Sequence, residues 1–421
     1  MSELDLGTYD PMERSVQQNP FPFYAELRRR APVFRHPKTG MYFISTLEAV
    51  NEVLAAPETF SSQFANTATL PSGSVRGELL QIFAKAFPPV NTMLTADPPL
   101  QTRYRKVVGR AFSTRRILAL EPRIREICAD LISRWPARGQ VPLHDEFSVL
   151  FPVKVISYAL NMRPEVEARI KPWSDDSVAA LGVDISDDRR LEAARGLVEM
   201  QHYWATEFED RRKHPRDDFL SDLAQTDFED ETGAVRLLSI PELLSIIAQL
   251  MVAGNETTTK LLNETVRLLI ENPLEWKRIQ QDPSAIPAMV EEALRLSTPN
   301  QGMFRVALRD TEIDGVKIPK GSMLWIMFGS ANRDERTFPD PDRFDPTRPN
   351  LREHIAFGRG AHFCIGAPLA RLEARVAFEE LAKRVETIRF APGQTFEYEP
   401  SFILRGLKTL AIEVEMKASG R

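Results

Sequence analysis

The stretch Phe357-Gly-Arg-Gly-Ala-His-Phe-Cys364-Ile-Gly366 contains one of only two cysteines in the 421-residue chain, the other being Cys128. Three glycines surround Cys364, at positions 358, 360 and 366. Glycine has no Cβ, so these positions can take left-handed backbone angles or let another group approach the backbone closely. A good helix-forming run, residues 367–375, follows at once. The sequence therefore predicts that Cys364 lies on a glycine-shaped loop that opens into a helix.

The start of a helix is a favourable place for a cysteine thiolate. Aligned peptide dipoles and free N–H groups at that end stabilise negative charge and lower the pKa of a nearby thiol. A lone thiolate with backbone donors suits either nucleophilic chemistry or a single bond to a metal. A buried structural cysteine, which behaves as a small hydrophobic residue, is the alternative for Cys364.

The pattern Phe-Gly-x-Gly-x-His-x-Cys-x-Gly resembles the haem-binding signature of the cytochrome P450 family and shows no departure from it. The resemblance extends from about residue 10 to residue 416. It implies that Cys364 is the thiolate ligand of haem b (iron protoporphyrin IX). It also implies a mainly α-helical fold with smaller β-sheets, in which a long central helix lies over the haem and the cysteine loop lies on the opposite face. Other residues of the signature would contact the cofactor: Phe357, Gly358, His362 and Gly366.

Composition is that of a globular protein, with 43% hydrophobic and 27% charged residues. A net charge of −5 gives no reason to expect a nucleic-acid partner. Two cysteines cannot make a disulfide framework, which favours a reducing compartment. The N-terminal residues carry no basic region followed by an apolar run, and no stretch approaches about 18 uninterrupted apolar residues. No linker or repeat divides the chain. We therefore expect a monomeric, cytoplasmic protein without membrane attachment, whose residues 1–421 form a single catalytic domain.

Residues 239–272 predict a long buried helix. Ser239-Ile-Pro-Glu242 is a capping box with proline in the first turn, and apolar residues then surround the axis. Some 30 residues would span about 45 Å. The polar segment Ala253-Gly-Asn-Glu-Thr257 interrupts the apolar run, and local inconsistency of this kind often marks a functional site. The resemblance implies that Ala253 and Gly254 leave room for the haem, and that Glu256 and Thr257 are an acid–alcohol pair beside the sixth iron position. A helix kink with a satisfied threonine is the alternative.

Two further motifs support the resemblance. Glu292-Ala-Leu-Arg295 places an acid and a base on one helical face, a spacing that surface ion pairs often produce. The resemblance implies that this pair supports the haem loop, braced by the polar run 332–348. Arg305, in the strand-like Met303-Phe-Arg-Val306, would bind a haem propionate.

A basic run follows Asp97-Pro-Pro. Residues 101–116 contain six Arg or Lys and no acid. A solvated basic face is the usual explanation of such a run. The resemblance implies that Arg105 binds a propionate and that the outer basic residues receive an acidic electron-transfer protein. Gln101 stands where the family commonly has His, and its propionate contact is therefore open; Gln can donate a hydrogen bond but carries no charge.

Other segments give local predictions. Residues 21–30 and 47–54 predict helices, and 33–36 with 41–45 predict a hairpin that presents His36 at the surface. Residues 118–225 predict a helix-rich region with Cys128 in its core. The resemblance implies that residues 60–96 and 178–190 set substrate choice, the second as part of a lid, and that residues 300–304 and 401–404 line the pocket. These segments are mainly apolar, which favours an apolar organic substrate.

The resemblance implies a haem-thiolate monooxygenase that activates O₂ with two electrons. The chain shows neither a Gly-x-Gly-x-x-Gly motif after a strand nor enough cysteines for a four-thiolate cluster. A ferredoxin, of the 2Fe-2S type, and its reductase would supply the electrons. There are three alternatives. The protein could be a haem-thiolate enzyme that uses peroxide, one that catalyses another reaction such as C–C coupling or desaturation, or a non-catalytic haem protein. Glu256 and Thr257 favour O₂ activation, because a peroxide user does not need that proton relay.

Overall fold

The computed structural model describes residues 6–7, 9–64, 75–179 and 185–418. It is mainly helical with four small sheets in this described part, which confirms the predicted fold class. The chain divides into two compact units, each made of separate stretches of sequence. The first unit comprises residues 1–60, 121–152 and 257–421, and the second comprises residues 61–120 and 153–256.

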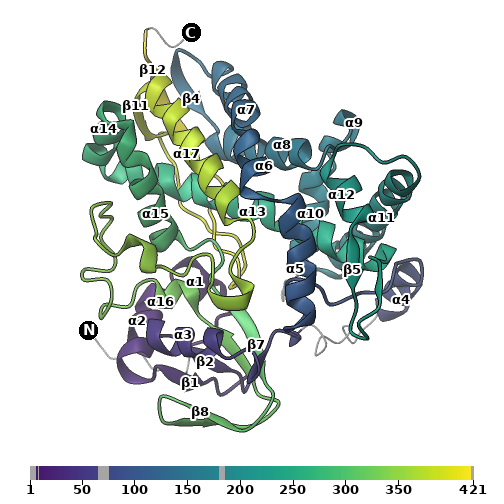
Figure 1. Ribbon diagram of the computed structural model, residues 1–421. Helices are drawn as coiled ribbons and strands as arrows, with labels where there is room; N and C mark the ends of the chain where they lie inside the picture. Colours follow the sequence, from purple (N-terminus) through teal and green to yellow (C-terminus); the bar gives the residue numbers. More distant parts are fainter. Residues whose placement is uncertain (1–5, 8, 65–74, 180–184, 419–421) are drawn as a thin grey trace. The chain divides into compact units, whose positions relative to one another are not determined.

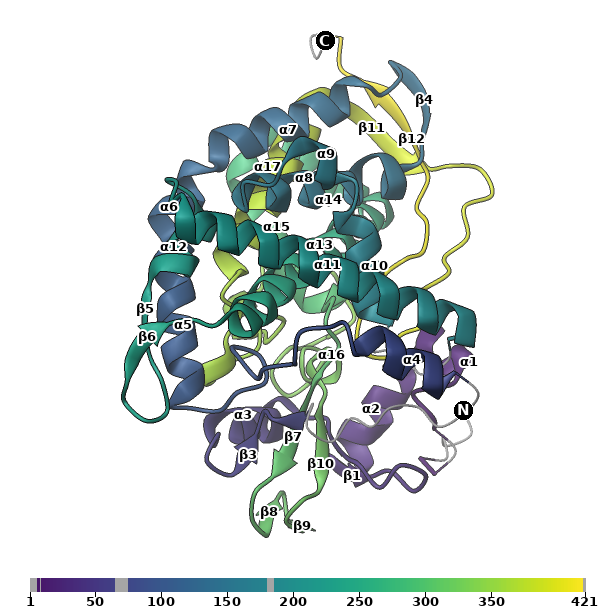
Figure 2. The same cartoon turned by 90° about the vertical axis from the view of Figure 1, so that its right-hand side faces the viewer.

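The sheets of the first unit are built from strands far apart in sequence. The largest has the order β1-β2-β10-β7-β3, with bounds Val33–Arg35, Tyr42–Ile44, Met323–Ile326, Met303–Ala307 and Phe60–Ser61; the last strand ends just inside the second unit. A second sheet pairs β11 (Val385–Phe390), β12 (Ile412–Met416) and β4 (Arg138–Val141). β8 (Thr311–Ile313) and β9 (Val316–Ile318) form a hairpin between β7 and β10 (Figure 2).

The first unit also contains helices, of which α17 follows the cysteine loop. They are α1 (Arg14–Gln18), α2 (Phe21–Arg30), α3 (Leu47–Ala55), α7 (Glu121–Ser133), α14 (Pro273–Gln281), α15 (Ile286–Ser297), α16 (Phe328–Ala331) and α17 (Ala367–Arg384). α7 and α17 lie side by side (Figure 1). The buried face of α7 includes Ile124, Ile127 and Leu131 at helical spacing, and Cys128 on that face is fully buried, as predicted.

In its described residues, the second unit is mainly helical and has one hairpin. It contains α4 (Arg76–Phe83), α5 (Leu100–Ala111), α6 (Thr114–Ala119), α9 (Pro164–Glu167), α10 (Ile170–Ala179), α11 (Asp187–Lys213) and α12 (Phe219–Gln225). β5 (Asp227–Glu229) and β6 (Val235–Leu237) form the hairpin, and α8 (Leu150–Ala159) begins at the end of the first unit. α10 and α11 pack against each other (Figure 2). Residues 65–74 and 180–184, which belong to the predicted substrate segments, lie outside the described residues.

The predicted long helix is α13 (Ile240–Glu271), of 32 residues. Its capping box is formed: the Ser239 N–H donates to Glu242 Oε2 at 2.6 Å, and the Glu242 N–H donates to Ser239 Oγ at 3.4 Å. The boundary between the two units falls within this helix, between Glu256 and Thr257. Among the described residues, no helix is both long enough and apolar enough to cross a membrane.

The prediction that His36 lies at the surface is wrong. The hairpin itself forms as β1 and β2, but His36 is fully buried. Its Nε2 lies 2.7 Å from the Tyr9 carbonyl oxygen and its Nδ1 lies 3.0 Å from Thr39 Oγ1. The ring also stacks on Phe43 at 5.1 Å between centroids. The N-terminal segment that covers this imidazole is 27 residues away in sequence, and local pattern does not report it.

Candidate active site

Cys364 lies on a tight loop that leads into α17, as predicted. The Cys364 N–H donates to the Phe357 carbonyl at 2.9 Å, which closes the loop, and the Ala367 N–H donates to the Cys364 carbonyl at 3.3 Å. The Cys364 side chain is half-buried, whereas Cys128 is fully buried and burial raises the pKa of its thiol well above the usual value. Cys364 is therefore the cysteine placed to bind a ligand. Cys128 is a packing residue.

The glycines of this loop are favoured at their positions for different physical reasons. Gly358 and Gly360 adopt φ angles of +66° and +67°, a region that side-chain-bearing residues rarely enter. A Cβ on Gly360 would also lie 2.8 Å from the Leu54 carbonyl oxygen. A Cβ on Gly366 would lie 3.8 Å from Cys364 Sγ, so its absence keeps space open beside the sulfur.

Glu291 fastens both flanks of the cysteine loop, a role that sequence analysis missed. Its carboxylate accepts hydrogen bonds from Arg371 Nε at 2.6 Å and Nη2 at 2.8 Å, on the helix after the loop. It also accepts from His354 Nε2 at 2.9 Å, on the segment before the loop. The Arg371 guanidinium lies 4.6 Å from the Phe357 ring centroid. Burial alone would raise the pKa of Glu291, but the hydrogen bonds from Arg371 and His354 lower it to about 2.

Glu292 and Arg295 form a fully buried ion pair. Arg295 Nε and Nη2 donate to the two carboxylate oxygens at 2.7 and 2.8 Å, and both side chains are 0% exposed. Arg295 Nη1 donates to the carbonyls of Asn332 and Pro341, while Arg348 Nε and the Asp345 N–H donate to Glu292. The polar run 332–348 therefore braces the pair, as predicted. The same Glu-x-x-Arg spacing at Glu275 and Arg278 gives only a partly exposed pair at 3.3 Å.

The middle of α13 is more accessible than the helix around it. Ala253 is exposed and Thr257 is half-buried, whereas Met251, Asn255 and Glu256 are buried. Ala253 and Thr257 are four residues apart and lie on one helical face. A Cβ on Gly254 would lie 3.2 Å from Ile156 Cδ1, so this glycine allows close packing against α8. The small side chain on the accessible face is that of Ala253.

Glu256 forms an ion pair that the sequence did not reveal. Lys171 Nζ on α10 lies 3.0 Å from Glu256 Oε1 and also pairs with Asp175. Burial alone would lower the pKa of the Lys171 ammonium, but Glu256 and Asp175 raise it above its usual value. Glu256 is 3% exposed, and Lys171 reaches it from a side chain that is 30% exposed. The carboxylate is thus buried while its cationic partner extends toward solvent.

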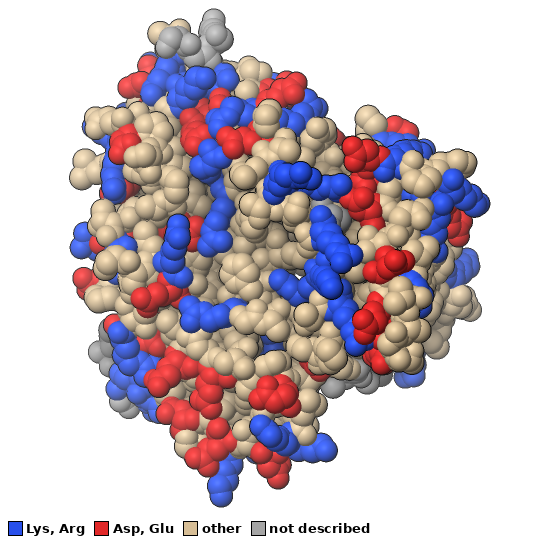
Figure 3. Space-filling model, viewed as in Figure 1, with Lys and Arg blue, Asp and Glu red and all other residues tan. Residues whose placement is uncertain are grey.

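Gln101 and Arg105 lie on α5, with Gln101 buried and Arg105 half-buried. Of the basic residues in this region, Arg103 pairs with Glu229 at 3.1 Å and Arg116 pairs with Asp222, both within the second unit. The exposed ones are Lys106, Arg110 and Arg115. Lys and Arg side chains gather over α5 in Figure 3.

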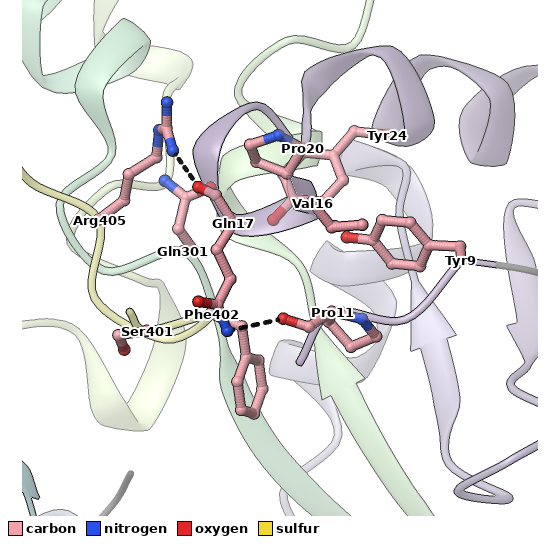
Figure 4. A pocket seen from close by; sticks show the side chains of 10 residues that line it. All are labelled: Tyr9, Pro11, Val16, Gln17, Pro20, Tyr24, Gln301, Ser401, Phe402 and Arg405. Atoms are coloured by element: carbon pink, nitrogen blue, oxygen red, sulfur yellow. Dashed lines mark hydrogen bonds between the residues drawn. The ribbon is translucent and has the colours of Figure 1, made fainter. Parts of the chain in front are cut away.

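Arg305 lies in β7 and is 5% exposed; its Nη1 donates to the Phe304 carbonyl at 2.7 Å. The two predicted pocket segments of the first unit run side by side. The Gln301 N–H donates to the Ile403 carbonyl at 2.7 Å, and Asn300 and Leu404 form an antiparallel bridge. A cavity of about 10 Å³ beside them is lined by residues of both segments and of the N-terminal region (Figure 4): Gln301, Ser401, Phe402 and Arg405, with Tyr9, Pro11, Val16, Gln17, Pro20 and Tyr24. It has room for about one water molecule.

Comparison with known proteins gives the family. The cytochrome P450 family profile matches residues 195–389. The chain is 35% identical to the vitamin D(3) 25-hydroxylase of Pseudonocardia autotrophica over 98% of both chains. Its structure matches a cytochrome P450 of Chondromyces apiculatus with a TM-score of 0.85 and 34% identity, over 99% of this chain and 100% of the other. It also matches a P450 of Bacillus megaterium in complex with corticosterone, with a TM-score of 0.80 and 29% identity, over 95% and 100%.

The chain belongs to the cytochrome P450 family. It is a P450 monooxygenase, and its cofactor is a haem with thiolate ligation. The residues around Cys364 fit that group. A half-buried sulfur at the start of α17 can supply one soft anionic ligand, and the missing Cβ of Gly366 leaves space next to it.

Proposed function

We propose that this P450 hydroxylates an apolar organic molecule with a haem held by Cys364; O-dealkylation and epoxidation belong to the same reaction class. The observation that carries the proposal is the loop of Cys364, closed by its own backbone hydrogen bond and followed by α17. The free N–H groups at the start of a helix favour the thiolate over the thiol, and the thiolate is the form that binds a metal.

Further residues would hold the cofactor. In the first unit we assign Phe357, Gly358, His362 and Gly366 around Cys364, and Arg305 to a propionate. In the second unit we assign Arg105 and Gln101 to propionates, and Ala253 to the macrocycle; Gly254 keeps this part of α13 close to Ile156. When bound, a thiolate-ligated haem supplies the oxidation of a C–H bond by O₂.

Glu256 and Thr257 are the proposed proton-handling residues. The Thr257 hydroxyl can both donate and accept a hydrogen bond, and it lies on the same helical face as the accessible Ala253. Glu256 is buried and paired with Lys171, which holds the acid on α13 next to Thr257. Lys171 holds the Glu256 carboxylate by this ion pair and is itself partly exposed to solvent. Proton transfer by such positioned groups typically contributes about 10²–10⁴-fold to a rate.

The absorption spectrum of the reduced protein under carbon monoxide tests the ligand assignment. We expect a Soret band far to the red of that of a histidine-ligated haem in the wild type and in Cys128→Ala. We expect that band to be lost in Cys364→Ala. A thiolate-type band in Cys364→Ala would refute the assignment of this residue.

A peroxide-using enzyme is the second candidate, and the threonine separates the two. If Thr257 directs protons during O₂ activation, Thr257→Ala should keep the haem but release a larger share of its electrons as hydrogen peroxide. Equal product yield per electron in the wild type and the variant would refute the relay. Equal activity of the wild type with hydrogen peroxide alone and with reductants would favour the second candidate.

A sterol-like molecule is one substrate class that the comparisons offer, beside the 6-deoxyerythronolide B hydroxylase and the P450 in complex with erythromycin B that are also related to this chain. One relative is a vitamin D(3) hydroxylase, and one related structure contains corticosterone. The segments 300–304 and 401–404 contribute Met303, Phe304, Phe402, Ile403 and Leu404. Titration of the ferric protein with vitamin D₃ and corticosterone should shift its Soret band. Absence of a shift with both, alongside a shift with terpenes or fatty acids, would move the assignment to another apolar class.

A 2Fe-2S ferredoxin and its reductase would supply the two electrons. The enzyme would act in the cytoplasm as a monomer, with residues 1–421 forming one catalytic domain. The exposed Lys106, Arg110 and Arg115 support an acidic partner. Reduction by a ferredoxin should slow as salt rises, and the salt dependence should weaken in Lys106→Ala and Arg110→Ala. A salt-independent rate would contradict an electrostatic docking surface.

A further inference from the structure

Lys260 is a buried lysine on α13, three residues after Thr257. It is 2% exposed, although lysine is rarely buried unless it is paired. Its Nζ lies 3.0 Å from Glu399 Oε2, and that glutamate is 28% exposed. A buried ion pair seldom stabilises a fold more than apolar residues of similar size would. The pair therefore calls for a reason other than stability.

Both ends of one loop meet at the Lys260 side chain. Glu399 precedes the loop 400–405 and Gly406 follows it, and the Glu399 N–H donates to the Gly406 carbonyl at 3.0 Å. A Cβ on Gly406 would lie 2.2 Å from Lys260 Cγ and 3.0 Å from its Cδ. The glycine thus makes room for the aliphatic stem of Lys260, while Glu399 binds its ammonium group.

The loop is also fixed along the rest of its length. The Arg405 N–H donates to the Pro299 carbonyl at 2.9 Å, and the Arg405 side chain donates to the Gln17 carbonyl at 2.7 Å (Figure 4). Phe402 packs against Phe304 and Trp325 at 6.0 and 5.2 Å between ring centroids. These contacts tie the loop to segments 14–18 and 299–304. Lys260 adds a tie to the helix that carries Thr257.

We propose that Lys260 is a positioning residue that fixes loop 400–405 at a set distance from Thr257. This distance limits the positions that a bulky ligand can take in the pocket. The proposal rests on the proposed function, because it takes residues 401–404 as a pocket wall. Lys260 lies against Glu399 and Gly406 at the two ends of the loop, and neither Lys260 nor Glu399 is assigned a chemical step.

Azole ligands of two sizes test the proposal on the haem-loaded protein. Imidazole is too small to depend on the loop, whereas econazole must contact the pocket walls. Both are followed by the shift of the ferric Soret band. Lys260→Met and Glu399→Gln should each change the econazole Kd by about tenfold and leave the imidazole Kd within about twofold. The double variant should change the econazole Kd no further than either single variant does, because the two residues form one interaction.

Lys408 offers a matched control in the same hairpin. Its pair with Glu397 at 2.6 Å is exposed, so Lys408→Met should leave both affinities within about twofold. An econazole-to-imidazole ratio that stays at the wild-type value in folded Lys260→Met and Glu399→Gln would overturn the proposal.

Hydrogen exchange measures the tether without haem. Amides of residues 401–404 should exchange about tenfold faster in Lys260→Met and Glu399→Gln than in the wild type and Lys408→Met. Unchanged exchange in both variants would overturn the proposal. A wild type that binds neither azole would instead refute the haem function, and the exchange comparison would still decide the role of Lys260.

Discussion

Two buried glutamates on different helices show how the same side chain can serve structure or chemistry. Glu292 on α15 accepts hydrogen bonds from two nitrogens of Arg295, from Arg348 and from the Asp345 N–H, and its side chain is 0% exposed. Glu256 on α13 is paired with the ammonium of Lys171, whose own side chain is 30% exposed. The first carboxylate is enclosed by donors from a helix and from a braced loop. The second is joined to a flexible, partly solvated lysine.

This difference is what would separate a scaffold residue from the proposed proton-handling residue. A guanidinium fork holds a carboxylate in one geometry, so Glu292 is suited to fixing the segment around Asp345 and Arg348, which precedes the cysteine loop in sequence. A lysine ammonium is a point charge on a four-carbon stem and can exchange partners. Glu256 is therefore suited to gaining and losing a proton. The following predictions test that division.

Glu292→Ala should have the largest effect. It leaves Arg295 buried without its carboxylate, and breaking a buried pair in this way costs about 3–5 kcal/mol of unfolding free energy. Urea unfolding measures the loss. Glu275→Ala removes an acid with the same spacing to its arginine from a partly exposed pair, and it should cost less than about 1 kcal/mol. Equal losses in the two variants would show that spacing, rather than enclosure, decides the effect.

Glu256→Gln should instead lower turnover and spare stability. Gln has nearly the same shape but cannot carry a proton, so product formation should fall by about 10²-fold, equivalent to about 2.7 kcal/mol of activation free energy. Steady-state rates with whichever sterol-like ligand shifts the Soret band provide the measurement. Glu271→Gln, at the exposed end of the same helix, is the control and should retain the wild-type rate. A Glu256→Gln variant as fast as the control would remove Glu256 from the proton path.

Local patterns in the sequence predicted the elements well and the partners poorly. The capping box at Ser239, the helix 21–30 and the glycine loop at Cys364 each depend on neighbouring residues, and each was predicted. Glu256 lies 85 residues from Lys171, Glu291 lies 80 residues from Arg371, and Lys260 lies 139 residues from Glu399. Only the folded chain brings these partners together. His36 was assigned wrongly for the same reason. A hairpin pattern gives the strand direction but not what covers its tip.

Glu291→Gln tests a third carboxylate, which accepts hydrogen bonds from both Arg371 and His354. Its pKa is held at about 2, below the usual 4.5, so the ionised form stabilises the folded state above about pH 4.5. That contribution is lost as the pH falls from 4.5 through 2. We expect the wild type to exceed Glu291→Gln by about 1–3 kcal/mol at pH 6, and most of the difference to vanish by about pH 2. Urea unfolding at both pH values measures it. A difference that does not shrink in acid would show that the carboxylate charge contributes nothing.

Lys171→Met should have the smallest effect and the most specific one. Removing the ammonium leaves Glu256 buried without that counter-charge, which favours the neutral acid over the carboxylate. Turnover at neutral pH should therefore fall by about three- to fivefold and recover at higher pH, because the acid limb of the pH–rate profile moves upward. Lys171→Arg keeps the charge and should restore the wild-type profile. Lys154→Met breaks a comparable pair, with Glu167 at 2.7 Å in the same unit, and should leave the profile unchanged. An identical profile in Lys171→Met and Lys154→Met would mean that Glu256 works without its lysine, and the contrast with Glu292 would then rest on burial alone.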